Sequence, residues 1–373
     1  MYPVKNPSHD TRAGNSTPWA AIKLLLVCLL TASVPYALYV RVASKNVKAA
    51  VTAPASGRSG SYLNAQEGQA LRSDYRGEQS VIQALQSGQA KPRTLASVDL
   101  DGDATPELLS GYAYGSTGIV TIQRGNPEAF APKDESVYQR MHDGYNPNSL
   151  LPTAETYQVP VAADFLQVGD FNNDRRQDVL VAAQGGDLFL LPGDDSGNLS
   201  APTQVALPGV VTALTAGEFR APDGRTDVAV GVDGPSGPQV LVYDGANGVS
   251  GEPMILALAS RATGLEFGEM DDNPFMGLAI ATGNEVEVVH GWGRKTSASL
   301  ESRVEKIDTG MNVRGLASGF FVWSREGSKQ LAALGDDGTI RIFGRGQLNT
   351  QPLSDEEITA RGRLRLQPKR SPL

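Results

Sequence analysis

The middle of the chain repeats one arrangement of apolar and polar positions five times. Each copy begins with an apolar segment in which a leucine precedes a small or apolar residue by three positions. These leucines follow one another at intervals of 71, 48, 51 and 51 residues, and they are Leu95, Leu166, Leu214, Leu265 and Leu316. Self-similarity at a nearly constant period predicts that each copy folds into the same structural unit.

Two further apolar segments follow each of these leucines. The second segments are mostly apolar, and they read ELLSGYA, DVLVAAQ, DVAVGVD, GLAIATG and QLAALGD. The third segments alternate more and close on a glycine, which is Gly125, Gly193, Gly245, Gly291 or Gly344. Continuous apolar runs indicate strands that are buried on both faces, and alternation indicates half-exposed strands. Each copy is therefore predicted to form three or four short strands.

A repeat of this size predicts a particular architecture. A period of about 50 residues with three or four strands is typical of a propeller blade, which buries its faces only against neighbouring blades. We therefore predict an all-β fold, a β-propeller of about five blades over residues 93–345. The longer first interval places an insertion at residues 126–156, between the outer strands of the first blade. Such insertions often project from one face and bind there. A sixth, divergent blade within residues 60–92 or 345–373 remains an alternative.

An acidic loop joins the first and second segments in two of the copies. At relative positions 1, 3, 5 and 9, the first loop carries Asp99, Asp101, Asp103 and Glu107, and the second carries Asp170, Asn172, Asp174 and Asp178. This alternation allows short oxygen-bearing side chains to converge on one hard cation. Asp and Asn are also ordinary turn formers, so solvated turns are the alternative interpretation.

The repeated segments resemble the FG-GAP, or VCBS, repeats, whose blades build the propellers of integrin alpha subunits and many bacterial surface proteins. The resemblance covers about residues 93–345. It is carried by DLDGDATPELL from Asp99 and DFNNDRRQDVL from Asp170, with GEFRAPDGRTDVAVG from Gly217 as a decayed third copy. No copy preserves the family's Phe-Gly followed by Gly-Ala-Pro.

The resemblance implies one or two structural calcium sites. The ligands would be the four side chains of each acidic loop, with the carbonyl of Thr105 added in the first loop and the carbonyl of Arg176 in the second. Where the family often has glycine at position 6, this chain has Ala104 and Arg175, which calls the curvature of both loops into question. The third, fourth and fifth loops lack the full set of ligands, and calcium is not expected there.

Composition and charge narrow the functional classes. A net charge of -8 and 6% aromatic residues argue against a nucleic-acid binder, which needs a concentrated basic surface. The single cysteine, Cys28, excludes an intrachain disulfide. The histidines, His9, His142 and His290, have no partner at metal-ligand or catalytic-triad spacing, and glycine patterns for dinucleotides or phosphates are absent. We therefore expect no enzyme activity and no small-molecule substrate.

The amino-terminal region contains a candidate membrane anchor. Residues 24–40 form a 17-residue uncharged run between Lys23 and Arg41, and such a length barely crosses a bilayer as a helix. We predict a polar segment at residues 1–18, a single transmembrane helix at 19–42, and a linker with a short helix at 43–92. A cleaved signal peptide is the main alternative, and lipid attachment at Cys28 is a further one.

A basic tail at residues 346–373 follows the repeats. It begins with SDEEITA, in which Ser354 and Glu357 have the spacing of a helix capping box. The segment ARGRLRLQ, from Ala360, also alternates well enough to form an outer strand of the fifth blade. Trp292 and Trp323 are expected to pack within the blades.

The sequence as a whole predicts a membrane-anchored, non-catalytic β-propeller that acts as a protein-interaction or scaffold module. Its expected place is the extracytoplasmic side of the cytoplasmic membrane, in the periplasm or on the cell surface, with other membrane or envelope proteins as partners. One alternative is an accessory structural subunit of a larger membrane protein complex. The other is an extracytoplasmic carbohydrate-active enzyme, which would need acids and aromatics clustered at one mouth of the propeller.

Overall fold

The computed structural model describes most of the chain that follows residue 72. The described residues are 73–130, 132–219, 223–271, 275–292, 303–323, 325, 329–345, 349 and 351–365. The predicted polar segment, the transmembrane helix and most of the linker lie outside them. Among the described residues, none of the helices is both long and apolar enough to cross a bilayer.

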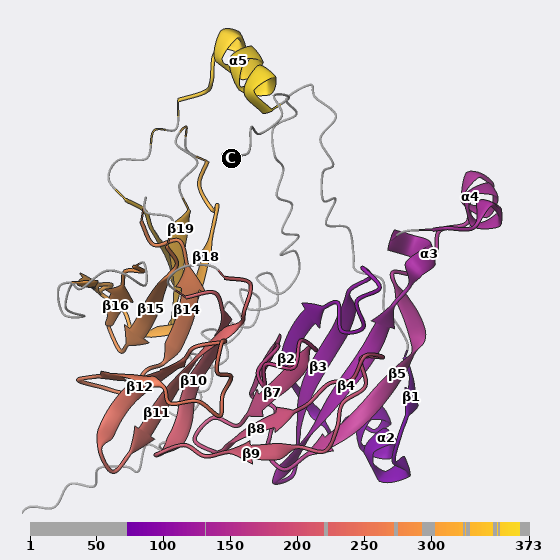
Figure 1. Ribbon diagram of the computed structural model, residues 1–373, viewed down its shortest axis with the longest axis horizontal. Coiled ribbons are helices and arrows are strands. Elements are labelled where there is room, and N and C mark those ends of the chain that lie inside the picture. The colour runs from indigo at the N-terminus through magenta and orange to yellow at the C-terminus, as the bar shows by residue number, and fades with distance from the viewer. Residues whose placement is uncertain are drawn as a thin grey trace, which may run out of the picture. The chain divides into compact units, whose positions relative to one another are not determined.

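The strands form five sheets that follow one another along the chain (Figure 1). The first sheet has the order β1-β5-β4-β3-β2 and contains β1 (Asp74–Arg76), β2 (Lys91–Val98), β3 (Glu107–Tyr114), β4 (Thr117–Gly125) and β5 (Leu150–Val159). The second contains β6 (Phe165–Gly169), β7 (Asp178–Ala182), β8 (Leu188–Leu191) and β9 (Thr203–Val205). The third contains β10 (Val210–Gly217), β11 (Asp227–Gly234), β12 (Gly237–Tyr243) and β13 (Met254–Ala257).

The two remaining sheets continue the series. The fourth contains β14 (Gly264–Gly268), β15 (Gly277–Thr282), β16 (Glu285–Val289) and β17 (Val304–Asp308). Within the described residues, the fifth contains β18 (Val313–Gly319), β19 (Gln330–Gly335) and β20 (Ile340–Phe343). Neighbouring strands are antiparallel in every sheet except for the parallel pair of β1 and β5.

The structure confirms the predicted strands of all five copies. Each first strand ends on the small or apolar residue that the sequence alignment marked: β2 on Val98, and β6, β10, β14 and β18 on glycines. The first strands also contact one another in order, β2 with β6, β6 with β10, β10 with β14 and β14 with β18. The sheets are therefore stacked like propeller blades, and the all-β prediction is confirmed.

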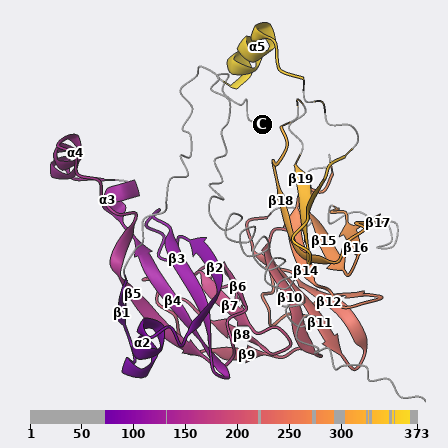
Figure 2. The same ribbon diagram turned by 180° about the vertical axis from the view of Figure 1, so that it is seen from behind.

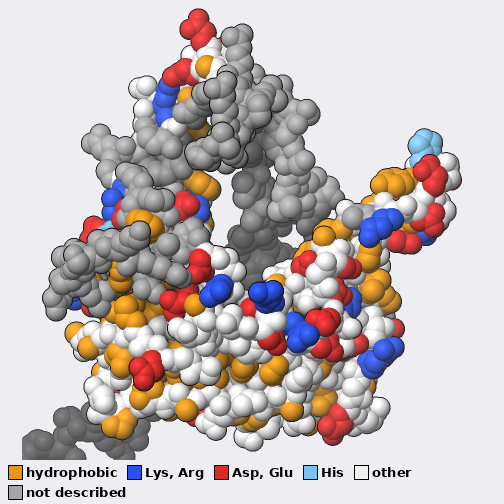
Figure 3. All heavy atoms as spheres, viewed as in Figure 1, with side chains coloured by type: hydrophobic (Ala, Val, Ile, Leu, Met, Phe, Trp, Pro, Cys, Tyr) orange, Lys and Arg blue, Asp and Glu red, His pale blue; other side chains and the backbone are white. Residues whose placement is uncertain are grey.

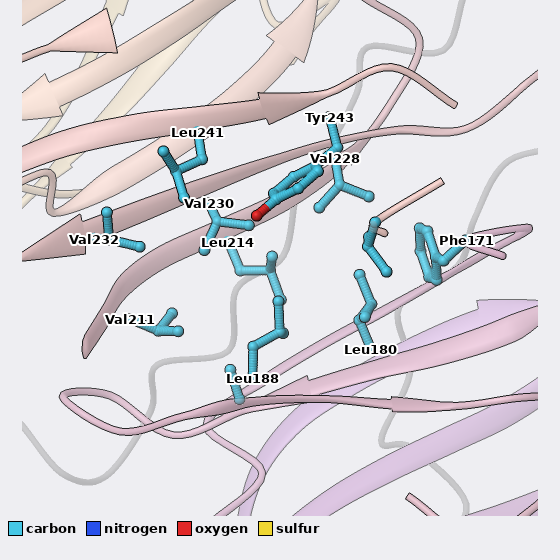
Figure 4. Close-up of a cluster of buried hydrophobic side chains, with 12 residues drawn as sticks. Phe171, Leu180, Leu188, Val211, Leu214, Val228, Val230, Val232, Leu241 and Tyr243 are labelled. Carbon is cyan, nitrogen blue, oxygen red and sulfur yellow. The ribbon is translucent and has the colours of Figure 1, made fainter. Parts of the chain in front are cut away.

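The second strand of each inner sheet supplies side chains to two cores. In β7, Val179 and Val181 pack with the first sheet, whereas Leu180 and Ala182 pack with the third. Successive side chains of a strand point to opposite faces, so a nearly continuous apolar run can fill the cores on both sides. Figure 4 shows one such core, where Leu180 and Leu188 from the second sheet meet residues of the third sheet.

Additional elements surround the first sheet. Helix α2 (Gln79–Gln86) packs on it through Val81 and Ala84, as expected for the short helix of the linker. Strand β2 begins at Lys91, two residues before the predicted boundary at residue 93, and β1 adds a further strand at the outer edge of the sheet. The sequence hid β1 because three residues carry no periodic signal.

The insertion lies where the sequence placed it, between the outer strands β4 and β5. It contains α3 (Pro127–Phe130) and α4 (Glu135–His142). In both Figure 1 and Figure 2, α4 projects away from the sheets.

Helix α5 (Asp355–Arg365) begins at the predicted capping box. The Ser354 amide donates to Glu357 Oε2 at 2.8 Å, and the Glu357 amide donates to Ser354 Oγ at 3.3 Å. The alternative of an outer strand over ARGRLRLQ is wrong for its described part, because residues 360–365 continue the helix.

Candidate functional site

The first acidic loop is closed by hydrogen bonds from its own backbone. Asp99 accepts from the amides of Gly102 at 2.8 Å and Ala104 at 2.9 Å. Asp103 accepts from the amide of Thr105 at 2.7 Å. One carboxylate oxygen from each of Asp99, Asp101 and Glu107 lies within 4.8 Å of the others. Three of the predicted metal ligands, Asp99, Asp101 and Glu107, therefore lie close enough together to hold one cation.

Glu107, at position 9 of this loop, links two parts of the blade. It is buried, and it accepts from the amides of Leu100 at 2.7 Å and Gly125 at 3.4 Å. Burial raises the pKa of Glu107 above its ordinary value, although both backbone hydrogen bonds act in the opposite direction. Glu107 thus fastens the start of the loop to the end of the third strand.

The second acidic loop has a similar hydrogen-bond pattern. Asp170 accepts from the amides of Asp174 at 3.0 Å and Arg175 at 2.8 Å. Asn172 accepts from the amide of Asp174 at 2.9 Å, and Asp174 accepts from the amide of Arg176 at 2.9 Å. The first residue of each loop thus accepts from position 6, but its second bond comes from position 4 in the first loop and from position 5 in the second.

Asp178 fastens this second loop as Glu107 fastens the first. It is fully buried, and it accepts from the amides of Phe171 at 3.0 Å, Asn172 at 3.2 Å and Gly193 at 2.9 Å. Burial raises the pKa of Asp178. Gly193 is required at the end of the third strand, because a Cβ there would overlap the carbonyl oxygen of Gln177.

Basic side chains lie beside both acidic loops. Arg124 Nη1 lies 3.5 Å from Asp101 Oδ2. Arg176 pairs through Nε with Asp195 at 2.6 Å and lies 3.7 Å from Asp174. These cations offset part of the carboxylate charge of the loops, so a bound metal would not be the only source of neutralisation.

The residues at position 6 do not prevent the loops from curving. Ala104 and Arg175 adopt positive φ values of 69° and 72°. Position 4 does the same, with Gly102 at 75° and Asn173 at 64°. A left-handed conformation costs a residue with a side chain about 1 kcal/mol relative to glycine. The loops therefore curve without glycine at position 6 and store some backbone strain.

The fastening at position 9 persists where the acidic pattern has decayed. Asp227, one residue late in the third loop, accepts from the amides of Phe219 and Gly245, both at 2.7 Å. In the fifth loop, Gln330 lies two residues late, and its Oε1 accepts from the amides of Phe321 at 2.8 Å and Val322 at 2.9 Å. The sequence pattern assigned position 9 to metal binding alone. The hydrogen bonds that this side chain accepts from the backbone are evident only from its burial beside the closing glycine in the structure.

The fourth sheet has a network of ionisable side chains in place of this fastening. Gly277 occupies position 9, and His290 bridges two carboxylates, Asp271 at 2.8 Å from Nδ1 and Glu305 at 3.1 Å from Nε2. Arg345 lies 4.0 Å from both carboxylates. The network borders a cavity of about 630 Å³ between the fourth and fifth sheets. The spacing of the histidines in the sequence gave no sign of this network, because Glu305 lies on a strand outside the repeated pattern.

The two tryptophans differ in environment. Trp292 packs edge-on against Phe219 at 5.7 Å between ring centres, as expected for blade packing. Trp323 has half of its surface exposed, so the same expectation for it is wrong.

The insertion presents aromatic side chains on a braced support. Arg140 lies 2.9 Å from Glu128 and 4.6 Å from the ring centre of Tyr145, and the Tyr145 hydroxyl donates to Glu128 at 3.3 Å. Phe130 and Tyr138 are 50% and 52% exposed. Figure 3 shows hydrophobic, acidic and basic side chains together on this projecting part.

Comparisons with known proteins give a limited result. No protein-family model matches the chain, and no curated protein matches its sequence. Among solved structures, the chain is similar to BBS1N in its complex with ARL6DN, in crystals soaked with lead or with mercury. The TM-scores are 0.42 and 0.40 at 19% and 20% identity, over 70% of this chain and 65% and 63% of those chains. This chain thus spans somewhat less than two thirds of the BBS1N chains. The resemblance to FG-GAP repeats stays a prediction.

Proposed function

We propose that the protein is a non-catalytic interaction module of the β-propeller class, which docks a protein partner through the α3–α4 insertion. The observation that carries this proposal is the projection of α4, with exposed aromatic side chains, from an otherwise well-packed first sheet (Figure 2).

The insertion is held in a defined conformation. At its base, Asn126 donates through its amide to Ser149 at 2.9 Å and through Nδ2 to Asn148 at 2.8 Å. Helix α4 is capped by Asp134, which accepts from the amide of Ser136 at 2.9 Å. A preorganised surface loses less entropy when a partner binds. This rigidity supports a docking role.

The exposed aromatics have the chemistry of interface anchors. Phe130 and Tyr138 leave half of their surface open, and they share the projection with charged residues. Aromatic side chains dominate the binding energy of protein interfaces when they enter pockets of the partner, and a charged rim adds specificity. We therefore expect Tyr138 to be a larger contributor to binding than the polar residues around it.

A photoreactive benzoyl-phenylalanine in place of Tyr138 tests the docking site. In native membranes, illumination should attach one discrete protein to position 138. The same group in place of Val210, which is also exposed but lies on the third sheet, is the control and should attach none. No product at 138, or the same products at both positions, would contradict the proposal.

We further propose structural calcium in the first two loops. The converging oxygens of Asp99, Asp101 and Glu107 fit a hard cation, and the second loop is closed by a similar set of backbone hydrogen bonds. The predicted ligands remain those given above, including the carbonyls of Thr105 and Arg176. A calcium ion bound there would stabilise the folded chain, because the unfolded chain has no preformed site.

Thermal unfolding with and without a chelator tests the metal proposal. Chelation should lower the Tm of the wild type, and added calcium should restore it. A variant with both Asp99→Asn and Asp170→Asn should respond much less, whereas Glu218→Gln in the decayed third loop should respond like the wild type. An unchanged Tm of the wild type on chelation rules out the calcium sites.

The membrane tether and the extracytoplasmic location belong to the same proposal. The apolar run at residues 24–40 supports a tether. Loops of this kind are expected to bind calcium weakly, so they are occupied more fully where the calcium concentration is millimolar. This supports a location on the extracytoplasmic side. Protease protection of the sheets in sealed inverted vesicles, lost when the vesicles are opened, would verify both together.

A further inference from the structure

A groove lies between the outer strands of the second and third sheets. It has a volume of about 510 Å³, which falls within the usual range for small-molecule pockets, about 300–1,000 Å³. Its lining includes Leu190, Val205, Leu241, Tyr243, Val249 and Ile255. Most of this lining is aliphatic, so the groove suits a ligand that buries mainly hydrocarbon surface.

Tyr243 is the unusual member of this lining. It is 4% exposed, and its hydroxyl forms no hydrogen bond with any described residue. Figure 4 shows its hydroxyl oxygen among the apolar side chains of the core. Tyr243 is one of the residues that line the groove. A ligand in the groove that supplies an acceptor would give this hydroxyl the hydrogen bond that the described residues do not provide.

The protonation state of Tyr243 fixes which partner it needs. Burial raises the pKa of Tyr243 above its ordinary value of 10.0, so the hydroxyl is protonated at neutral pH and can donate. The matching group on a ligand is an acceptor oxygen, such as that of a ketone, an ester or an amide.

The charge around the groove sets a second requirement. Glu252 is the one acidic residue of the lining, and none of the lining residues is basic. An acidic group at the border of a largely apolar groove disfavours an anion, and the lining offers no cation to pair with it. A fatty acid or another anionic amphiphile therefore fits poorly. The cavity between the fourth and fifth sheets has a more polar lining than this groove, because both acidic and basic residues line it: Glu269, Glu305, Lys329 and Arg345.

We propose that the groove between the second and third sheets binds a small, uncharged, largely apolar molecule whose acceptor oxygen receives a hydrogen bond from Tyr243. This site is independent of the proposed docking by the insertion, which lies on the first sheet. It also departs from the expectation that the chain binds no small molecule.

A fluorescence titration of the full chain with Nile red tests the proposal. Nile red is uncharged and apolar and carries one carbonyl acceptor, and 1-anilinonaphthalene-8-sulfonate serves as the anionic comparison. The blocking variant is Ile255→Trp, in which the larger ring covers the groove from a position that is already 59% exposed. The control is Ile340→Trp, which makes the same change at an exposed position of the fifth sheet. Dye that binds at other places on the protein contributes the same signal in every variant, so it does not affect the comparison between variants.

The proposal predicts one saturable Nile red site that Ile255→Trp removes and Ile340→Trp leaves intact. Tyr243→Phe should keep the fold, because the lost hydroxyl has no partner in the protein, and should weaken binding about 2- to 10-fold, the effect of one neutral hydrogen bond. Equal binding by the wild type and Ile255→Trp would overturn the groove as a site. Unchanged affinity in Tyr243→Phe would overturn the role of the hydroxyl. An anionic dye that loses as much binding as Nile red in Ile255→Trp would overturn the charge requirement.

Discussion

The first and fifth sheets both stand at an end of the series, yet they differ in how their outward faces are covered. In the first sheet, α2 covers Ile119 and Tyr112, which are cross-strand partners, and Ile119 is fully buried. In the fifth sheet, the cross-strand partners Leu334 and Ile340 are 44% and 66% exposed. The first sheet has two strands more than the fifth, five against three.

The difference follows from the way the sheets share cores. Each inner sheet contributes one face to the core on either side, so a terminal sheet has one apolar face without a neighbour. Repeat proteins cover such faces with atypical capping elements. Helix α2 has this role for the first sheet, whereas no described element covers Leu334 and Ile340. We therefore expect stability to fall along the series from the first sheet to the fifth.

The largest expected effect comes from the capped face. Ile119→Ala leaves a cavity under α2 and should lower the free energy of unfolding by about 2–5 kcal/mol. The same change at the bare face, Ile340→Ala, should alter it by less than about 0.5 kcal/mol. Urea unfolding of both variants measures the contrast, and comparable losses would show that the fifth sheet is covered after all.

The next effect concerns the residues that fasten the loops. Glu107→Ala leaves the amides of Leu100 and Gly125 without an acceptor and should cost about 2–4 kcal/mol, measured in chelator to exclude metal effects. Gln330→Ala in the fifth sheet should cost about 1 kcal/mol, since water can reach the amides of Phe321 and Val322. Glu107→Gln keeps one acceptor oxygen, so its loss of unfolding free energy should lie between the losses of Glu107→Ala and Gln330→Ala. A larger loss in Gln330→Ala than in Glu107→Ala is incompatible with the account.

A smaller effect of opposite sign is expected in the first acidic loop. Ala104→Gly removes the cost of a positive φ and should stabilise the protein by up to about 1 kcal/mol, less the entropy that glycine adds to the unfolded chain. Ala333→Gly, at a buried strand position of the fifth sheet, is the control and should destabilise. The difference in Tm between the two variants is the readout, and loss of stability in both would remove the argument for strain.

The smallest effect is expected on the bare face itself. Leu334→Ser exchanges an exposed apolar side chain for a polar one and should change the free energy of unfolding by less than about 0.5 kcal/mol. It should also improve solubility, because exposed apolar patches promote association. Light scattering at increasing concentration gives the solubility readout, and a strongly destabilised variant would indicate a hidden neighbour of this face.

Most of the sheet framework was predictable from the sequence. The continuous run VLVA of β7 alternates between two cores, which is the physical reason for its lack of polar positions. The insertion was also predictable, since 71 residues separate Leu95 from Leu166 against about 50 elsewhere. Local patterns of this kind are properties of single strands, so they need no knowledge of tertiary contacts.

Features that depend on contacts between distant segments could not be predicted. The bond from Gly193 to Asp178 joins the end of a third strand to the start of a second strand, and it requires knowledge of the register. The pairing of His290 with Glu305 crosses from β16 to β17. The groove at Tyr243 arises only where the second sheet meets the third. The acidic residues of the loops were visible because they lie close together along the chain.

Native-state hydrogen exchange tests the central claim, a series of sheets that is capped at its first end and bare at its last. The account predicts that the amides of β4, in the first sheet, exchange only through global unfolding, whereas those of β20 exchange through local opening at a much lower free energy. Equal protection of β4 and β20 would contradict it.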